Sequence, residues 1–519
     1  MPSWALDRRR RRATARDAVT NPLAEGLDSE RRAPPVALVV FGASGDLTAR
    51  KLMPAIERLG RRRLLPAGFS VVGVARTEWT DDDFRGHMRA AVKDGGPMWD
   101  DLTSRFRYVA GDYAEPGTFD RLRATLADLD ATVGTGGNRV YYLATVPNVF
   151  GPVGRALGEH GLARPSGPDE FVRLVIEKPF GHDLETARAL DAELHEVFDE
   201  SQLYRIDHYL GKETVQNVIA LRFANAIFEP VWNRRYVDSV QITVAESVGV
   251  GHRAGFYEPA GALRDIVQNH VLQVLAITAM EPPAFVDSTG IRDEKVKLLR
   301  AVDVLSPDEV EADVVRGQYD AGWVEGEPAL GYRAEQGVSP TSNTETSVAM
   351  RLFIDNWRWA GVPFYVRTGK RMPKRLTEVS LEFKDVPHLP FSAGLARGLS
   401  PNALVLRIQP DEGITLRFGA KVPGQSFRVR TVSMDFSYGA AFVEESPEAY
   451  ERLLLDAMIG DPTLFIRTDE VEHAWRIVEP VLEAWSSGSA PLARYAAGTW
   501  GPAEADRLLA RDARHWRTP

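Results

Sequence analysis

Val36-Ala-Leu-Val-Val-Phe-Gly-Ala-Ser-Gly-Asp-Leu47 decides the fold of the first part of this chain. Its first six residues are apolar and rich in β-branched side chains, which is typical of a strand buried on both faces. Gly42 and Gly45 follow directly, and a helical pattern then continues to about Gly60. A strand, a glycine turn and a helix in this order predict the first unit of a parallel α/β sheet.

Further apolar runs of the same kind follow, separated by helical patterns, until about residue 206. They lie at 69–74, 106–110, 140–144 and 171–176. From about residue 237 the expected strands alternate polar and apolar residues instead, at 238–246, 378–383, 403–408 and 413–418. This alternation indicates an antiparallel sheet with one face in water. Helices expected to cover the other face lie near 261–280, 293–303, 447–460 and 469–485.

We therefore expect two domains, at 34–206 and 207–519, preceded by a tail at 1–33. The tail contains an arginine run from Arg8 to Arg12, interspersed acidic residues and few apolar ones. Such segments bury too little apolar surface to become ordered. The tail is accordingly expected to be disordered, with a basic arm or a transit-like segment as the weaker alternative.

The composition excludes several classes of protein. The 519 residues include no cysteine, so disulfides, thiolate metal sites and cysteine nucleophiles are excluded. The formal net charge of −9 argues against a nucleic-acid-binding protein. No apolar run approaches the roughly 18 residues that a membrane span needs. We expect a cytoplasmic protein that binds neither nucleic acid nor membranes.

The glycine turn after the first strand predicts a phosphate-binding site. Glycines there let the backbone approach a pyrophosphate, and the helix N-terminus supplies free N–H groups. The second strand ends at Arg76, whose guanidinium suits the 2′-phosphate of NADP. Lys51, on the first helix, could add positive charge. Glu78 leaves NAD open as the weaker alternative, because an acidic residue near this position binds a ribose 2′-hydroxyl.

Two short segments carry groups suited to an anionic substrate. Lys178, in Glu-Lys-Pro, follows the last strand of the first domain, where ligands of α/β sheets bind. The segment 204–213 places His208, Tyr209 and Lys212 within one turn. Its hydrogen-bond donors suit a dianionic phosphate, and so many such groups in a row make a merely solvated polar turn the weaker interpretation.

His270 lies in the apolar stripe of the helical pattern 261–275. For an isolated helix, a satisfied core histidine is the more common interpretation. A carboxylate from Asp207 or Asp265 could instead hold the ring in one tautomer, as a general base at neutral pH requires. Lys370 ends another strand in a glycine turn, and Arg375 follows it.

These motifs resemble those of the glucose-6-phosphate dehydrogenase family of the bacterial type. The resemblance is carried by segments at 42–47, 177–181, 205–213, 223–230, 264–270 and 367–370, in the family's order. The most specific is Arg205-Ile-Asp-His-Tyr-Leu-Gly-Lys-Glu213. The resemblance implies a Rossmann-type α/β coenzyme domain and an α+β domain with a large, mainly antiparallel sheet covered by helices.

The resemblance also implies a reaction, the oxidation of glucose 6-phosphate to its 6-phospho-1,5-lactone by NADP+, which opens the oxidative pentose phosphate pathway. It implies that His270 is the general base and that Asp207 is its partner. The substrate contacts that it implies are Lys178, His208, Tyr209, Lys212, Glu246, Asp265, Lys370, Arg375 and Gln409. The coenzyme contacts that it implies are Gly42, Ser44, Gly45, Asp46, Leu47, Lys51, Arg76 and Lys178.

The family also suggests a homodimer or homotetramer formed through the large sheet, and its reaction needs no metal. Two other interpretations are weighed against this one. A sugar dehydrogenase of another Glu-Lys-Pro family would act on an unphosphorylated sugar and would have no use for His208 together with Lys212. A catalytically inactive relative serving as a scaffold is expected to lack Asp207 or His270, and both are present.

Overall fold

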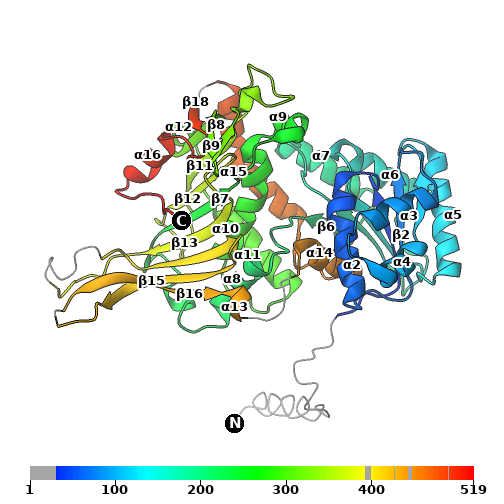
Figure 1. Cartoon of the computed structure of the whole chain (residues 1–519), viewed down its shortest axis with the longest axis horizontal. Helices are drawn as coiled ribbons and strands as arrows, with labels where there is room; N and C mark the ends of the chain where they lie inside the picture. The colour runs from blue at the N-terminus through cyan, green and yellow to red at the C-terminus, as the bar shows by residue number, and fades with distance from the viewer. Residues whose placement is uncertain (1–30, 392–398, 426, 442–446, 489) are drawn as a thin grey trace, which may run out of the picture.

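Two sheets with their helices build the molecule, and Figure 1 shows them side by side. This computed structural model describes residues 31–519 apart from 392–398, 426, 442–446 and 489. The tail expected at 1–33 lies outside the described residues up to position 30. No helix in the described part of the chain is long and apolar enough to cross a membrane.

The first sheet has seven strands in the order β17-β6-β5-β4-β1-β2-β3. Their bounds are β1 Val36–Phe41, β2 Phe69–Ala75, β3 Arg107–Ala110, β4 Arg139–Leu143, β5 Val172–Ile176, β6 Leu203–Ile206 and β17 Phe465–Ile466. All neighbours are parallel except β17 and β6, so the expected parallel sheet is confirmed. The chain order reverses between β1 and β4, and a crevice forms at the carboxyl ends of strands at such a point.

Helices connect these strands. Their bounds are α2 Met53–Arg61, α3 Asp81–Ala90, α4 Gly96–Ser104, α5 Pro116–Thr132, α6 Phe150–Glu159 and α7 Leu184–His195. A wide π-helical turn, Thr48–Leu52, leads from the glycine turn into α2. The glycine turn therefore lies between the end of β1 and a helix start, as the sequence predicts.

The second sheet has nine strands in the order β16-β15-β14-β13-β7-β12-β11-β8-β18. Their bounds are β7 Val237–Ala245, β8 Val314–Asp320, β11 Ser347–Leu352, β12 Phe364–Gly369, β13 Leu376–Phe383, β14 Ala403–Gln409, β15 Gly413–Lys421, β16 Val429–Ser437 and β18 Leu492–Ala496. Only the β7–β12 and β8–β18 pairs are parallel, so the mainly antiparallel sheet is confirmed. A separate hairpin pairs β9 Gly322–Val324 with β10 Glu327–Ala329.

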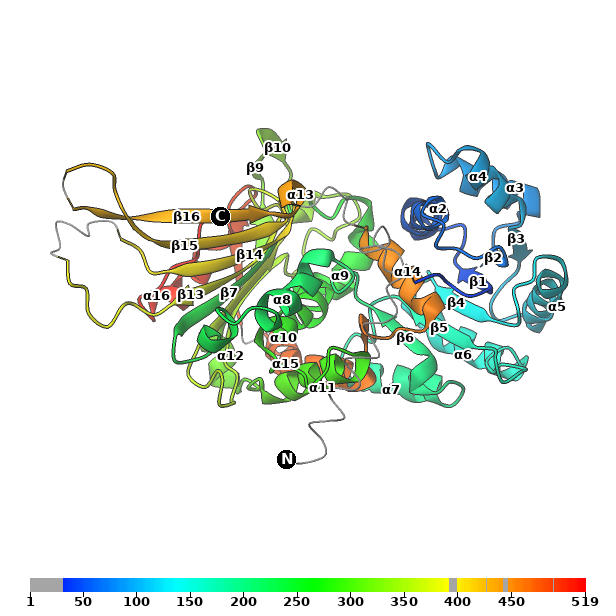
Figure 2. The ribbon, with the colours of Figure 1, turned by 90° about the horizontal axis from the view of Figure 1, so that it is seen from below.

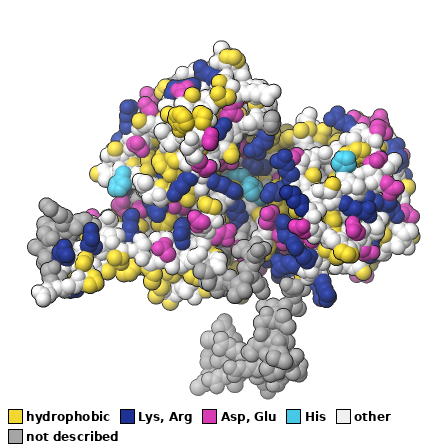
Figure 3. Space-filling model, viewed as in Figure 1, with side chains coloured by type: hydrophobic (Ala, Val, Ile, Leu, Met, Phe, Trp, Pro, Cys, Tyr) yellow, Lys and Arg dark blue, Asp and Glu magenta, His cyan; other side chains and the backbone are white. Residues whose placement is uncertain are grey.

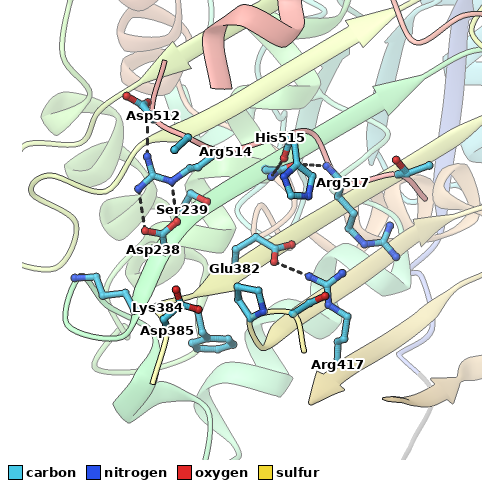
Figure 4. A pocket seen from close by; sticks show the side chains of 16 residues that line it. Asp238, Ser239, Glu382, Lys384, Asp385, Arg417, Asp512, Arg514, His515 and Arg517 are labelled. Atoms are coloured by element: carbon cyan, nitrogen blue, oxygen red, sulfur yellow. Dashed lines mark hydrogen bonds and ion pairs between the residues drawn. The ribbon is translucent and has the colours of Figure 1, made fainter. Parts of the chain in front are cut away.

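The expectation of one wet face is wrong for the middle of this sheet. In β7 every residue except Asp238 is buried, because the C-terminal segment of the chain lies across the face expected to be wet. Figure 4 shows Arg514 of this segment beside Asp238. Arg514 Nε donates to Asp238 Oδ2 at 2.7 Å, and the backbone N–H of Arg517 donates to Gln241 Oε1 at 2.8 Å. The Arg517 guanidinium also bonds Glu378 of β13 at 2.7 Å. Polar residues on this face therefore bond protein groups rather than water.

The helices of the second half pack mainly on the opposite side of the sheet (Figure 2). Their bounds are α8 Glu213–Phe223, α9 Ala254–Ala262, α10 Leu272–Ala279, α11 Ser288–Ala301, α12 Pro307–Asp313, α13 Tyr438–Ala441, α14 Ala449–Ile459, α15 Thr468–Ser486 and α16 Glu504–Ala510. The helix expected over 261–280 follows Gly261, whose backbone is not helical, and contains a π-helical stretch, Leu263–Val271, before α10. This stretch packs against β7, β11 and β12.

α14 does not cover the large sheet, which corrects the expectation for 447–460. It packs against α2 of the first domain, and Figure 2 shows it between the two halves of the molecule. Arg58 of α2 pairs with Glu448 at 3.2 Å and also with Glu451. These ion pairs attract the start of α14 to the first domain.

Candidate active site

A cavity of about 580 Å³ opens between the carboxyl ends of the first sheet and the second domain. The first domain contributes Leu47, Glu177 and Lys178, and the second contributes residues from the loop after β7, from β14 and from the π-helical stretch. Figure 3 shows Lys and Arg side chains gathered along the junction of the two domains, with a histidine among them. Positive charge is therefore concentrated at this junction although the chain is acidic overall.

His270 and Asp207 form a buried pair at the floor of this cavity. His270 Nδ1 lies 2.6 Å from Asp207 Oδ1, and the two residues are 1% and 2% exposed. The backbone N–H of Tyr209 donates to the same carboxylate oxygen at 2.8 Å. With Nδ1–H donated to Asp207, the Nε2 atom of His270 is left as the acceptor for a substrate proton.

The environment prepares this pair for proton transfer near neutral pH. Burial lowers the pKa of His270 below its ordinary value of 6.5, and the attraction of Asp207 opposes this only in part. Burial alone would raise the pKa of Asp207, but the rings of His270 and His208 and the N–H of Tyr209 hold that pKa well below its usual range. The site therefore contains a neutral imidazole beside an ionised carboxylate.

One end of the cavity gathers hydrogen-bond donors. Lys212 Nζ bonds Gln409 Oε1, and Arg375 donates to the same oxygen at 3.1 Å. The ring of Tyr209 stacks on His270 at 4.3 Å, and its hydroxyl lies 3.3 Å from Gln409 Nε2. Burial and the nearby Arg375 lower the pKa of Lys212 to about 8. Two cations close together attract an anion strongly.

Two lysine–carboxylate pairs line the other side. Lys178 Nζ donates to Asp265 Oδ1 at 2.8 Å and to its backbone oxygen at 2.7 Å. Lys370 Nζ bonds Glu246 Oε2 at 2.5 Å. The second pair follows from strand register: β7 and β12 are parallel with Ala245 opposite Gly369, so the next residues, Glu246 and Lys370, meet beyond the sheet edge.

The glycine turn forms a close backbone cradle. Gly42 has a φ of +81°, and a Cβ there would lie 2.3 Å from the backbone oxygen of Ala144, so only glycine fits. The backbone N–H of Gly42 donates to the hydroxyl of Tyr113 at 2.8 Å, and Thr77 Oγ1 donates to Ser44 Oγ at 2.9 Å. A glycine turn whose backbone can approach a ligand closely, followed by a helix start, fits the pyrophosphate of a dinucleotide.

The predicted site residues are brought together only in part. Those that line the cavity are Leu47, Lys178, His208, Tyr209, Glu246, Asp265, His270, Arg375 and Gln409. Lys212 and Lys370 lie next to this lining, because Lys212 bonds Gln409 and Lys370 bonds Glu246. Asp46 instead pairs with Arg50 at the surface at 2.7 Å, and Lys51 lies 3.7 Å from Glu448. Arg76 is exposed at the end of β2 and lies outside the lining of this cavity.

Three residues beside the site, Glu177, Tyr142 and Tyr450, are not among those predicted from the sequence. Tyr142 donates its hydroxyl to Glu177 Oε1 at 2.5 Å, and the Tyr450 hydroxyl bonds the same carboxyl group. The Tyr450 ring lies parallel to His208, with centroids 6.3 Å apart. Burial raises the pKa of Glu177, and the two hydroxyl groups lower it less than burial raises it. Glu177 could have been predicted as a site residue from its place in the Glu-Lys-Pro motif, but no motif around Tyr450 indicates that it lies near the site.

Asp207, His208 and His270 offer three ligand atoms within 4.8 Å of one another, as a metal site would. The Oδ1 atom of Asp207 is already bonded to His270 Nδ1 and Tyr209 N–H. This arrangement suits a proton-transfer pair.

The fold and the site together define a nicotinamide-dependent oxidoreductase. The profile described as "Glucose-6-phosphate dehydrogenase, NAD binding domain" matches residues 39–217, and the corresponding C-terminal domain profile matches residues 219–517. The chain belongs to the glucose-6-phosphate dehydrogenase family.

Named relatives agree with this assignment. "Glucose-6-phosphate 1-dehydrogenase 2" of Mycobacterium tuberculosis is 50% identical over 507 residues, covering 96% of this chain and 98% of the relative. The Bacillus subtilis "Glucose-6-phosphate 1-dehydrogenase" is 46% identical over 484 residues, covering 93% and 98%. A structure titled "Glucose-6-phosphate dehydrogenase in complex with its substrate glucose-6-phosphate" is 32% identical, with a TM-score of 0.86 over 95% of this chain and 100% of that chain.

Proposed function

We propose that this chain oxidises D-glucose 6-phosphate at C1 to 6-phospho-D-glucono-1,5-lactone, with NADP+ as the oxidant. The observation that carries the proposal is the buried His270–Asp207 pair beside a cationic pocket. In the family this reaction opens the oxidative pentose phosphate pathway.

The phosphate of the substrate binds at the end that holds Lys212 and Arg375. These two cations, with the donor groups of His208 and Tyr209, match a dianion that accepts several hydrogen bonds. Burial favours a neutral His208, because the imidazolium would be desolvated beside His270. Lys212 and Arg375 therefore supply the charge, and His208 supplies a hydrogen bond.

The sugar hydroxyls bind between the two lysine–carboxylate pairs, Lys178–Asp265 and Lys370–Glu246. Each pair offers a donor and an acceptor at a fixed separation. Gln409, bonded to Thr377 at 2.8 Å, orients its amide toward the same pocket. Such positioning contributes to rate by aligning C1 before reaction.

His270 Nε2 removes the proton of the C1 hydroxyl. Asp207 holds the ring in the required tautomer and stabilises the imidazolium that forms, as a buried carboxylate does for a catalytic histidine. As the hydroxyl loses its proton to His270, the electron pair of its O–H bond becomes the second bond of the C1 carbonyl, and the C1–H bond breaks with its own pair leaving as hydride. The bound nicotinamide supplies the acceptor for the hydride that leaves C1.

The first domain would hold the coenzyme with the turn from Gly42 to Leu47. Arg76 would contact the 2′-phosphate, which makes NADP the preferred coenzyme and NAD the weaker one. Lys51, which faces α14, would add charge near the junction rather than bind directly. The proton and hydride steps require alignment and a base, so we propose no role for a metal.

We also propose that the chain forms a homo-oligomer through the large sheet. On β15 and β16, directly opposed pairs place apolar side chains on one face: Ile414–Phe436, Leu416–Met434 and Phe418–Val432. Met434 is 58% exposed and Val432 is 39% exposed. A second copy of the chain would cover this patch.

The proposed function is tested with purified protein, glucose 6-phosphate, and NADP+ or NAD+, by the absorbance of the reduced nicotinamide. We expect rapid reduction of NADP+, slower reduction of NAD+, and little reduction when unphosphorylated glucose replaces the substrate. The absence of reduction with both coenzymes would overturn the proposal, and equal rates with glucose would favour a sugar dehydrogenase of another kind.

A further inference from the structure

Glu345 lies outside the substrate cavity, directly behind the helix that carries His270. It precedes β11 and is 6% exposed. Its Oε1 atom accepts the backbone N–H of Leu263 at 3.0 Å. Leu263 is the first residue of the π-helical stretch that contains Asp265 and His270. The carboxylate therefore caps the element that bears both groups.

The backbone of Glu345 binds the same region. Its carbonyl oxygen accepts the N–H of Ala262 at 3.1 Å and the hydroxyl of Tyr257 at 3.2 Å. Gly261, where the helix is interrupted, has a φ of +64°, and a Cβ there would lie 2.2 Å from Glu345 Oε1. The glycine is thus required by both its backbone conformation and the close approach of the carboxylate.

The next residue connects this contact to the opposite side of the substrate cavity. Thr346 accepts the backbone N–H of Lys370 at 2.9 Å, and Tyr495 donates its hydroxyl to the carbonyl oxygen of Lys370 at 2.7 Å. The ring of Tyr257 lies 4.9 Å from Lys370 Nζ. Residues 345 and 346 therefore join the start of the His270 helix to the strand end that presents Lys370.

A carboxylate at a helix N-terminus is stabilised by free N–H groups and by the helix dipole, and it holds that end in place. The first turn is where Asp265 meets Lys178, so a shift at Leu263 displaces both a proposed sugar contact and the proposed base. Displacements of about 1 Å at a site are costly, on the order of a hundredfold in rate.

We propose that Glu345 is a positioning residue, which sets the place of the helix bearing Asp265 and His270 relative to Lys370 without touching the substrate. The inference depends on the proposed function, because the residues that it positions are those assigned to sugar binding and proton removal.

The test compares Glu345→Ala with Glu345→Gln, whose amide oxygen can still accept the Leu263 N–H. For Glu345→Ala we expect kcat to fall about tenfold or more and the KM for glucose 6-phosphate to rise about fivefold. The dissociation constant of NADP+, measured by calorimetry, stays within about twofold because the glycine turn is untouched. Glu345→Gln recovers most of both losses.

Asp287→Ala is the matched control. Asp287 caps α11 by accepting the N–H of Gly290 at 2.7 Å, and that helix carries none of the proposed site residues. We expect Asp287→Ala to lower the melting temperature and to leave kcat and both binding constants unchanged. If Glu345→Ala does not fold, Gly261→Ala is used instead, because its added Cβ would clash with the Glu345 carboxylate. The same pattern is expected: a lower kcat and a higher KM for glucose 6-phosphate, with the dissociation constant of NADP+ nearly unchanged.

Three results would overturn the positioning role: unchanged KM and kcat in Glu345→Ala or Gly261→Ala, equal losses in substrate and NADP+ binding, or no recovery in Glu345→Gln. Each requires an active wild-type protein. A wild-type protein without activity contradicts the proposed function itself, so the two failures are distinguishable.

Discussion

His270 Nδ1 lies 2.6 Å from Asp207 Oδ1, although the two residues are 63 positions apart and belong to different parts of the fold. Asp207 directly follows β6 of the first sheet, and His270 lies on the π-helical stretch against the second sheet. The pair is therefore assembled only when the segment after β6 packs against the π-helical stretch.

His270→Asn is expected to lower kcat by about a hundredfold or more, because the asparagine cannot take up the C1 proton. Stopped-flow or steady-state reduction of NADP+ measures the loss, and the KM for glucose 6-phosphate should change little. Asp207→Asn should also lower kcat, since an amide N–H can favour the wrong tautomer of His270. Near-normal turnover in His270→Asn would remove it from the role of base.

The affinity for substrate is expected to fall above about pH 8, where the buried Lys212 loses its charge in the free protein. Below that pH the ammonium is present and attracts the phosphate. Bound phosphate retains the proton, so kcat/KM should fall with rising pH while kcat does not. Lys212→Arg should abolish this fall, because the guanidinium stays charged. An unchanged pH midpoint in Lys212→Arg would assign the titration to another group.

Arg76→Ala is expected to lower kcat/KM for NADP+ by about tenfold or more and to leave NAD+ nearly unaffected, because only NADP carries the 2′-phosphate. Coenzyme titrations at saturating substrate measure both. Arg123→Ala removes an exposed arginine of α5, paired with Asp120 at 2.9 Å, and serves as the charge-matched control. Equal weakening of the two coenzymes by Arg76→Ala would contradict the assignment.

Met434→Asp is expected to dissociate the oligomer, because it places a charge in the apolar patch of β15 and β16. Light scattering coupled to gel filtration measures the mass. Ser433→Asp adds the same charge to the other face of the same exposed strand and should leave the mass unchanged. The proposed interface at this patch would be contradicted by a monomeric wild-type protein or by an unchanged mass in Met434→Asp.

Much of the fold was predictable, because it depends on local patterns. The apolar run before Gly42 is a buried central strand, and β2, β4 and β5 follow the same pattern. The expectation that one face of β7 lies in water was wrong. Alternation of polar and apolar residues shows that the polar groups share a face, but not that water covers that face. Arg514, Arg517 and the backbone near His515 satisfy that face instead.

The candidate site was predicted in its residue types better than in its arrangement. Lys178, His208 and Lys212 belong to short motifs, so their placement at or beside the cavity follows from strand ends and one turn. Asp46 and Lys51 belong to a motif as well, yet they pair with Arg50 and Glu448. Asp46 finds its partner four residues along the chain, whereas the partner of Lys51 comes from a distant segment that the local sequence does not indicate.

The sequence by itself determined the parallel first domain, the glycine turn and the groups available for chemistry, because strand periodicity and turn conformation are local properties. Only the tertiary structure decided that Asp207, rather than Asp265, holds His270, and that Asp265 pairs with Lys178. It also decided that Glu345 caps the π-helical stretch that bears His270 and that Tyr450 reaches Glu177. These contacts join residues distant along the chain, and their formation depends on how separate elements pack in three dimensions.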